Sequence, residues 1–231
     1  MTAKVLNFPY YREEFNAFCI FGDKMNSFET DLRRAVLSIR FLLGAALQLL
    51  ILWTQGEASA LYRMSLPIVC TLPYACGWLE EYKTGYARLA LSRGSMRGYI
   101  LGKFLSCCIA GGGAEVLAAW LYVSLKAPGT EWDYGRTLLV AALWAAVAAV
   151  LAALSGSRYI AYGGAFVICY FLVIVSERYW PGLYCLYPYE WLDMRHTWPF
   201  GGAGVTLLLI GLLLVLFLCY YIILKGRIER D

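Results

Sequence analysis

The chain has 231 residues, of which 61% are apolar and only 16% are charged, and its mean hydropathy is +0.59. Soluble domains carry about 25% charged residues, and a soluble fold of this length could not bury so much apolar surface. The composition therefore excludes an ordinary soluble domain and predicts an all-α membrane protein. The net charge of +4 reflects topology rather than affinity for nucleic acid, as the distribution of Lys and Arg indicates below.

The N-terminal segment, residues 1–34, contains no short apolar region typical of a cleavable signal peptide, so we expect insertion to use the first span. Asn26 and Glu29 resemble a capping box. Apolar residues then recur at helical spacing, namely Phe28, Leu32, Ala35 and Ile39. The pattern predicts an amphipathic helix in the membrane interface, with Asp31, Arg33 and Arg34 on its other faces. The alternative is a simple extension of the first span.

Six stretches of about 20 mostly apolar residues predict six transmembrane helices. They make up a membrane domain, 35–224, and cover 35–53, 60–79, 99–123, 137–154, 159–175 and 205–224. The first contains Arg40, which can reach the nearby interface. The second contains Pro67 and Pro73, and because proline removes a backbone donor we expect this span to be kinked and packed inside. The last is rich in leucine and is expected to face lipid.

Charge counting gives the orientation of these spans. Fifteen of the twenty Lys and Arg residues fall on the side that holds both termini, and five fall on the opposite side. Since Lys and Arg are enriched in cytoplasmic loops, we expect a multi-pass protein of the cell membrane with both termini and the tail 225–231 in the cytoplasm. We also expect a bacterial origin.

Catalytic and metal-binding patterns are missing from the sequence. The eight cysteines form no CxxC pair and there is one histidine, so we expect no metal site and no intrachain disulfide. Glu80 and Glu81 could suggest an intramembrane protease, but the arginine expected four residues later is Gly85. No GxSG serine motif occurs, and His196 lies in an outer loop. No GxxxxGK[ST] phosphate loop is present either, so we expect neither an enzyme nor a bound cofactor.

Two predicted spans carry stripes of small residues. One stripe recurs every four residues at the entry of the third span, namely Gly98, Gly102, Ser106, Ala110 and Ala114. The fourth span carries two stripes of alanine, at positions 141, 145, 148 and 152 and at positions 142, 146, 149 and 153. Small residues let helices approach closely, either within one bundle or at an oligomer face.

Glu115 is the one acidic residue well inside a predicted span. A carboxylate at that depth is costly and usually faces a bundle interior or a water-filled cavity. With Gln48 of the first span, it is our candidate for the lining of a transport path. The alternative is a structural carboxyl that is protonated or hydrogen-bonded between helices.

Aromatic residues crowd the predicted outer loop, 177–203. Such side chains prefer the membrane interface, so we expect short re-entrant helices that close the top of a pathway. The candidate gate residues are Trp180, Tyr184, Tyr187 and Trp191. An aromatic belt without a gating role is the alternative.

A cationic segment between the second and third spans, residues 79–103 (LEEYKTGYARLALSRGSMRGYILGK), stands out in this apolar chain; we call it the handle. Helical spacing places Tyr82, Tyr86, Leu89 and Arg93 on one face and Lys83 and Arg88 on another, which predicts a short helix within 80–98. A basic loop that only sets the topology is the alternative.

The lead-in helix, the six spans and the handle together resemble the permease subunits of ABC-2 type ATP-binding cassette transporters. In that family a Glu is followed by a Gly, a basic residue and a Ser-Arg pair before a third span that bears a Lys. The matching positions are Glu81, Gly85, Arg88, Ser92 with Arg93, and Lys103.

The resemblance implies an exporter of a peptide, drug or lipid-linked substrate. Separate cytoplasmic ATPase subunits would bind ATP and Mg and would power it, and a second permease subunit, identical or different, would complete the pathway. The coupling helix would contact the ATPase through Glu81, Tyr82, Gly85, Tyr86, Arg88, Leu89 and Arg93. The alternative function is a membrane sensor, immunity or scaffold protein whose handle binds a cytoplasmic regulator.

Overall fold

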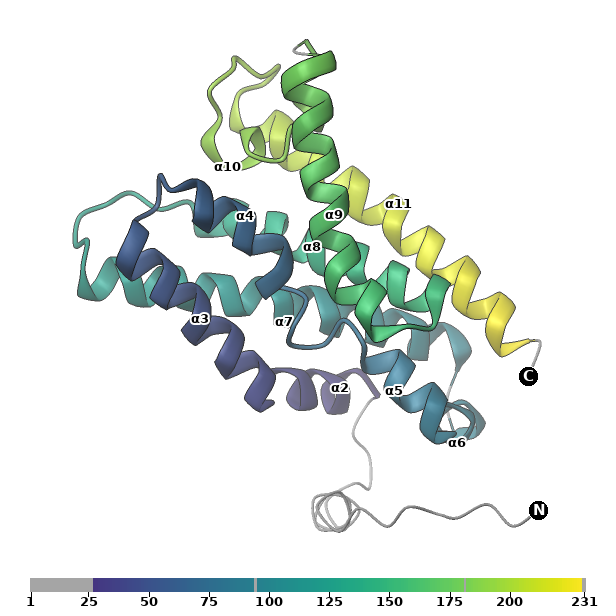
Figure 1. Cartoon of the computed structure of the whole chain (residues 1–231). Coiled ribbons are helices and arrows are strands. Elements are labelled where there is room, and N and C mark those ends of the chain that lie inside the picture. Colours follow the sequence, from purple (N-terminus) through teal and green to yellow (C-terminus); the bar gives the residue numbers. More distant parts are fainter. Residues whose placement is uncertain (1–26, 94, 181, 230–231) are drawn as a thin grey trace.

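The computed structural model describes residues 27–93, 95–180 and 182–229, and within these ranges it is all-helical, without a strand. A π-helical turn, Val175–Tyr179, extends α9, and a 3-10 turn, Tyr184–Leu186, precedes α10. The helices are α2 (Ser27–Val36), α3 (Ile39–Gln55), α4 (Ala60–Val69), α5 (Gly77–Thr84), α6 (Tyr86–Arg93), α7 (Met96–Leu125), α8 (Tyr134–Ser155), α9 (Arg158–Ile174), α10 (Glu190–Asp193) and α11 (Gly202–Ile228) (Figure 1).

Four of these helices are long and apolar enough to cross a membrane: α7, α8, α9 with its π-helical turn, and α11. A fifth candidate is the pair α2 and α3, which is bent by 48° between the two helices. The predicted span 60–79 is not one helix, because α4 ends at Val69 and the turn through residues 70–76 separates it from α5. Pro67 lies in the last turn of α4 and Pro73 in the turn that follows, where neither can continue the helical hydrogen bonding.

The core lies between α7 and α8, which pack against each other along much of their length. All eight alanines of the two stripes on α8 are buried. A Cβ atom added at Gly111 of α7 would lie 2.6 Å from the Cβ atom of Ala145, and one added at Gly112 would lie 2.8 Å from the carbonyl oxygen of Leu138. The small residues therefore serve close packing within the chain. In contrast, only 17% of the apolar window of α11 is buried, so this helix presents most of its surface outward, as its sequence predicts.

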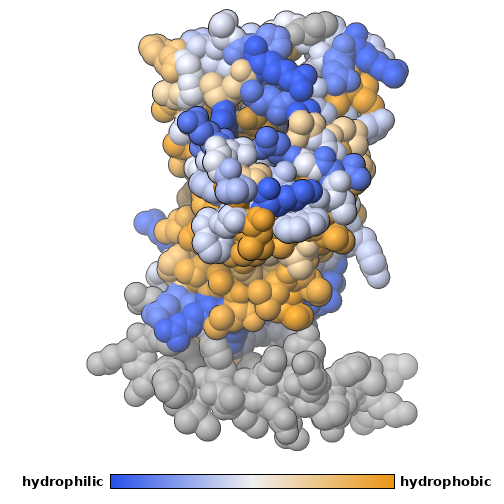
Figure 2. Space-filling model, turned by 90° about the vertical axis from the view of Figure 1, so that its left-hand side faces the viewer, coloured by the Kyte–Doolittle hydropathy of each residue, from blue (hydrophilic) through white to orange (hydrophobic). Residues whose placement is uncertain are grey.

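Polar residues gather at two ends of the bundle. At the handle end lie α5, α6, the turn between α8 and α9, and the last turns of α11 (Figure 1). At the other end, which we call the loop end, Arg63 of α4 pairs with Asp193 of α10 at 2.8 Å. Figure 2 looks onto the left-hand side of Figure 1 and shows hydrophilic residues across the middle and upper part of that face, with an apolar area below them.

Candidate functional site

A buried ionic cluster lies at the handle end, where α2, α5 and α7 meet, and Lys103 is its centre. The Lys103 Nζ atom donates to Asp31 Oδ1 and to Glu81 Oε1, both at 2.6 Å, and to the Tyr74 hydroxyl oxygen at 2.8 Å. The Tyr99 hydroxyl donates to Glu81 Oε2 at 2.8 Å, and the Tyr74 hydroxyl donates to Asp31 Oδ1 at 3.0 Å. These five residues, named the ionic cluster, join three helices and the turn before α5.

The ionic cluster is shielded from solvent, and Arg34 beside it balances its charge. The side chains of Lys103, Asp31 and Glu81 are 1%, 5% and 11% exposed. Arg34 of α2 pairs with Glu81 at 3.3 Å, so two cations face two carboxylates. A charge buried without a partner costs several kcal/mol, and the balance explains how an apolar helix such as α7 can hold a lysine.

The sequence pattern predicted that Asp31 points away from the core, and this prediction was wrong. Asp31 is buried because it pairs with Lys103, and Phe28 one turn earlier packs on Gly102. This contact uses the small residue at Gly102, where an added Cβ atom would lie 3.5 Å from the Phe28 Cα atom. α2 is thus fixed against α7. Asn26, the first residue of the predicted capping box, lies outside the described residues.

Glu80, the neighbour of Glu81 on α5, makes a second and more exposed set of ion pairs. Its Oε1 atom accepts a hydrogen bond from Arg40 of α3 at 2.8 Å and lies 3.7 Å from Arg158 of α9. Consecutive helical residues point about 100° apart, so the two glutamates reach different neighbours. Through them α5 is held to α2, α3, α7 and α9.

The part of the handle within 80–98 forms two helices, α5 and α6, before α7 begins, and not the single helix that its spacing predicted. Gly85 has φ +75° and ends α5 in the left-handed conformation that favours glycine, and α6 begins at the next residue. Tyr82 and Tyr86 therefore do not share one helical face. Tyr82 stacks on Trp78 with ring centroids 5.0 Å apart, whereas the Tyr86 ring lies 5.4 Å from the Arg34 guanidinium.

The other predicted coupling residues lie on α6. The Leu89 side chain is 59% exposed. The side chains of Arg88 and Arg93 lie outside the part of the chain that is described. A groove of about 660 Å³ runs beside the handle, between α5, α6 and the end of α11. It is lined by Tyr82, Lys83, Thr84, Gly85, Ala87, Leu91 and Ile228.

The two candidate path residues are both completely buried. Gln48 of α3 accepts a hydrogen bond from the Ser65 hydroxyl of α4 at 3.1 Å, and its amide nitrogen has no partner among the described residues. Neither carboxylate oxygen of Glu115 has a partner among them. An added Cβ atom at Gly111, one turn before Glu115, would lie 2.6 Å from the Cys70 carbonyl oxygen, so this face of α7 meets the end of α4. Glu115 thus faces the protein interior.

The four candidate gate residues have different environments. Trp191 is 2% exposed, stacks on Trp144 of α8 at 6.0 Å and donates to the Cys185 carbonyl oxygen at 2.8 Å. Trp180 is 61% exposed. Tyr184 stacks on His196, and the Tyr187 hydroxyl donates to Glu177 at 2.8 Å. The described part of the loop is therefore folded around Trp191, whereas Trp180 lies on its surface.

Glu190 fixes the same loop and was not singled out in the sequence. Its carboxylate accepts hydrogen bonds from the backbone N–H of His196 at 2.6 Å and from the Trp198 indole at 3.4 Å. The His196 Nδ1 atom lies 3.1 Å from its other oxygen. Burial alone raises the pKa of Glu190, but these hydrogen bonds outweigh burial and place the pKa below its usual value of 4.5.

The sequence also did not single out the ionic cluster as a unit. The sequence feature that could have indicated this cluster is Lys103, a cation inside a predicted span, because such a residue requires a buried partner.

Within the described residues no group of histidine, cysteine and carboxylate side chains is arranged to hold a metal ion. Comparison of the chain with protein-family models, curated proteins and solved structures finds no match.

Proposed function

We propose that this chain is the permease subunit of an ABC-2 type exporter, embedded in the cell membrane with the handle end in the cytoplasm. Six membrane crossings require α3 to cross the bilayer once, and the broken segment from α4 to the start of α5 to cross it once. The interfacial helix is then α2, and the coupling element is the end of α5 together with α6. A second permease subunit and two ATPase subunits complete the transporter.

The observation that carries this proposal is the attachment of the handle. Glu80 and Glu81 tie α5 to α2, α3, α7 and α9, while the groove beside α5 and α6 stays open at the surface. The ion pairs hold α5 to the membrane helices, and the groove leaves the opposite side of α5 and α6 open to a partner. A partner that docks in the groove could therefore transmit its motion to the membrane helices. A closing ATPase could push α5 and α6 as a rigid body.

The buried polar groups support a transport path between α3, α4 and α7. Gln48 and Glu115 retain unused hydrogen-bonding atoms in an interior of small and apolar residues, and a site for a polar part of a substrate needs such atoms. The folded loop around Trp191 would form the outer gate of this path.

Affinity purification of the detergent-solubilised chain from its own cells tests the proposal. An ATPase subunit with a GxxxxGK[ST] loop should co-purify, and Leu89→Asp on the exposed side of α6 should weaken its retention at least tenfold. Leu125→Asp is the matched control, since Leu125 is 64% exposed but ends α7 at the loop end. Recovery of a regulator without an ATPase motif would instead support a sensor or scaffold, and it would contradict the permease.

A further inference from the structure

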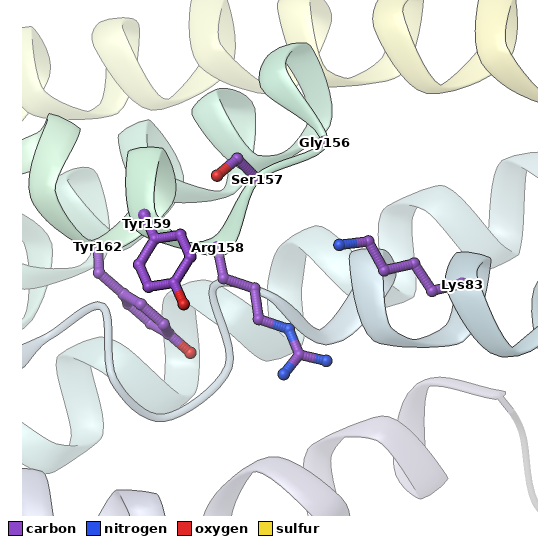
Figure 3. Close-up of a pocket in the computed structure, with 6 residues that line it drawn as sticks. All are labelled: Lys83, Gly156, Ser157, Arg158, Tyr159 and Tyr162. Carbon is purple, nitrogen blue, oxygen red and sulfur yellow. The ribbon is translucent and has the colours of Figure 1, made fainter. Parts of the chain in front are cut away.

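A second pocket opens at the handle end, beside the turn that joins α8 to α9. It has a volume of about 450 Å³, within the range of small-molecule sites. Its lining comes from α5, the turn and the start of α9, namely Lys83, Gly156, Ser157, Arg158, Tyr159 and Tyr162 (Figure 3). This pocket is distinct from the groove between α5, α6 and α11, although Lys83 borders both.

The position of the pocket is set by the two helices that meet there. Both α8 and α9 are long and apolar enough to cross a membrane, so the turn between Ser155 and Arg158 lies where the polar headgroups of a bilayer begin. Tyr159 is 89% exposed in the first turn of α9, as is typical of aromatic residues at a membrane interface.

The charge of the pocket is positive. Figure 3 shows Lys83 reaching from α5 toward Ser157 and Arg158. Lys83 is exposed and has no ion pair within the described ranges. Glu80, the carboxylate beside the pocket, pairs with Arg40 at 2.8 Å and with Arg158 at 3.7 Å, so one negative charge is shared by two arginines. Together with Lys83, two cations line the pocket and its surroundings keep a net positive charge.

A third positive group lies close by. The Arg227 guanidinium donates to the Leu154 carbonyl oxygen at 2.7 Å, and one of its nitrogens lies 3.5 Å from where a Cβ atom of Gly156 would be. The Ser157 side chain makes no capping hydrogen bond to α9, so the first N–H groups of this helix add donors beside Lys83 and Arg158. Charged and backbone donors around a small pocket match the oxygens of a phosphate group.

We propose that this pocket is a phosphate site, filled by the headgroup of an anionic phospholipid or by a free phosphate ion. Basic pockets between membrane helices bind such headgroups. The phosphate would connect Lys83 on α5 to Arg158 on α9 and would add a lipid-dependent link between the handle and a membrane helix. This proposal does not depend on the partner of the handle.

Native mass spectrometry of the purified full chain tests the site. Wild-type protein incubated with phosphatidylglycerol should retain one more lipid than protein incubated with phosphatidylcholine. Lys83→Gln with Arg158→Gln should abolish this difference. Lys225→Gln is the control, because Lys225 is a half-exposed cation at the same end, paired with Glu229 at 3.7 Å. The single variant Lys83→Gln removes an exposed cation that has no ion pair among the described residues, so it should fold normally and reduce retention severalfold.

A second experiment, with inorganic phosphate, distinguishes a phospholipid headgroup from a free phosphate ion as the ligand. If the free ion is the ligand, phosphate should bind wild type and the Lys225 variant but not the double variant, and phosphatidylglycerol should show no preference. Equal retention of phosphatidylglycerol by wild type and both Lys83 variants, together with no difference in phosphate binding, would overturn the proposal.

Discussion

Replacing Lys103 with methionine should be the most damaging single change at the handle end. Lys103 makes two 2.6 Å contacts to carboxylates at 1% side-chain exposure. Without it, Arg34 still pairs with Glu81, but Asp31 keeps only the Tyr74 hydroxyl, and its second oxygen has no partner among the described residues. Removing one partner of a buried ion pair costs about 3 to 5 kcal/mol, or about 150- to 4,000-fold in the folding equilibrium.

The free energy of unfolding is measured by denaturant titration of the purified protein in mixed micelles. Adding Asp31→Asn to Lys103→Met should restore much of the loss, since one cation and one carboxylate are then removed together and Arg34 remains paired with Glu81. Arg33→Ala is the control for a solvent-exposed pair, because Arg33 is 57% exposed, and it should change stability by less than about 1 kcal/mol. The reasoning is refuted if Lys103→Met costs no more than Arg33→Ala.

Two further changes test the local geometry. Gly85→Ala should destabilise the protein by about 1 to 2 kcal/mol in the same titration, because φ is +75°. Apart from its chain neighbours, no described residue lies within 4 Å of the added Cβ atom, so a steric clash does not contribute. Gly163→Ala is equally open but has no positive φ, so it should cost nothing, and equal effects of the two changes would contradict strain from the left-handed backbone. The pKa of Glu190 is lowered in the folded protein, so its carboxylate stabilises the loop above the ordinary pKa of 4.5, and this stability is lost as the pH falls further. Glu190→Gln should therefore flatten the fall in melting temperature below pH 4.5. An unchanged pH profile would contradict this prediction.

The long helices could be predicted from the sequence because their signal is local. The predicted span 99–123 lies within α7, and the span 137–154 lies within α8. Each is a continuous apolar run, so composition alone locates it. The secondary structure of the handle was harder to predict, because the spacing of its residues favoured one helix that continues through Gly85. A glycine between two helical stretches is also a typical helix end, and the left-handed backbone at Gly85 determined the outcome.

The ionic cluster could be predicted only in part. Lys103 inside an apolar run indicates that a buried partner exists, but spacing cannot identify Asp31, which is 72 residues away in the chain. That contact depends on how α2 folds back onto α7 at the Phe28 and Gly102 contact. Glu80 and Glu81 were considered as a catalytic pair in the sequence, and their role as ion-pair acceptors became visible only in three dimensions.

We propose above all that α5, held by Glu81 to Lys103 of α7, transmits the motion of an ATPase to α7. This claim is tested most directly by substrate-stimulated ATP hydrolysis of the reconstituted complex with Glu81→Gln, compared with wild type. We predict that the variant retains the ATPase subunit and its basal hydrolysis but loses most of the stimulation. Stimulation equal to wild type, at equal ATPase retention, would contradict the claim.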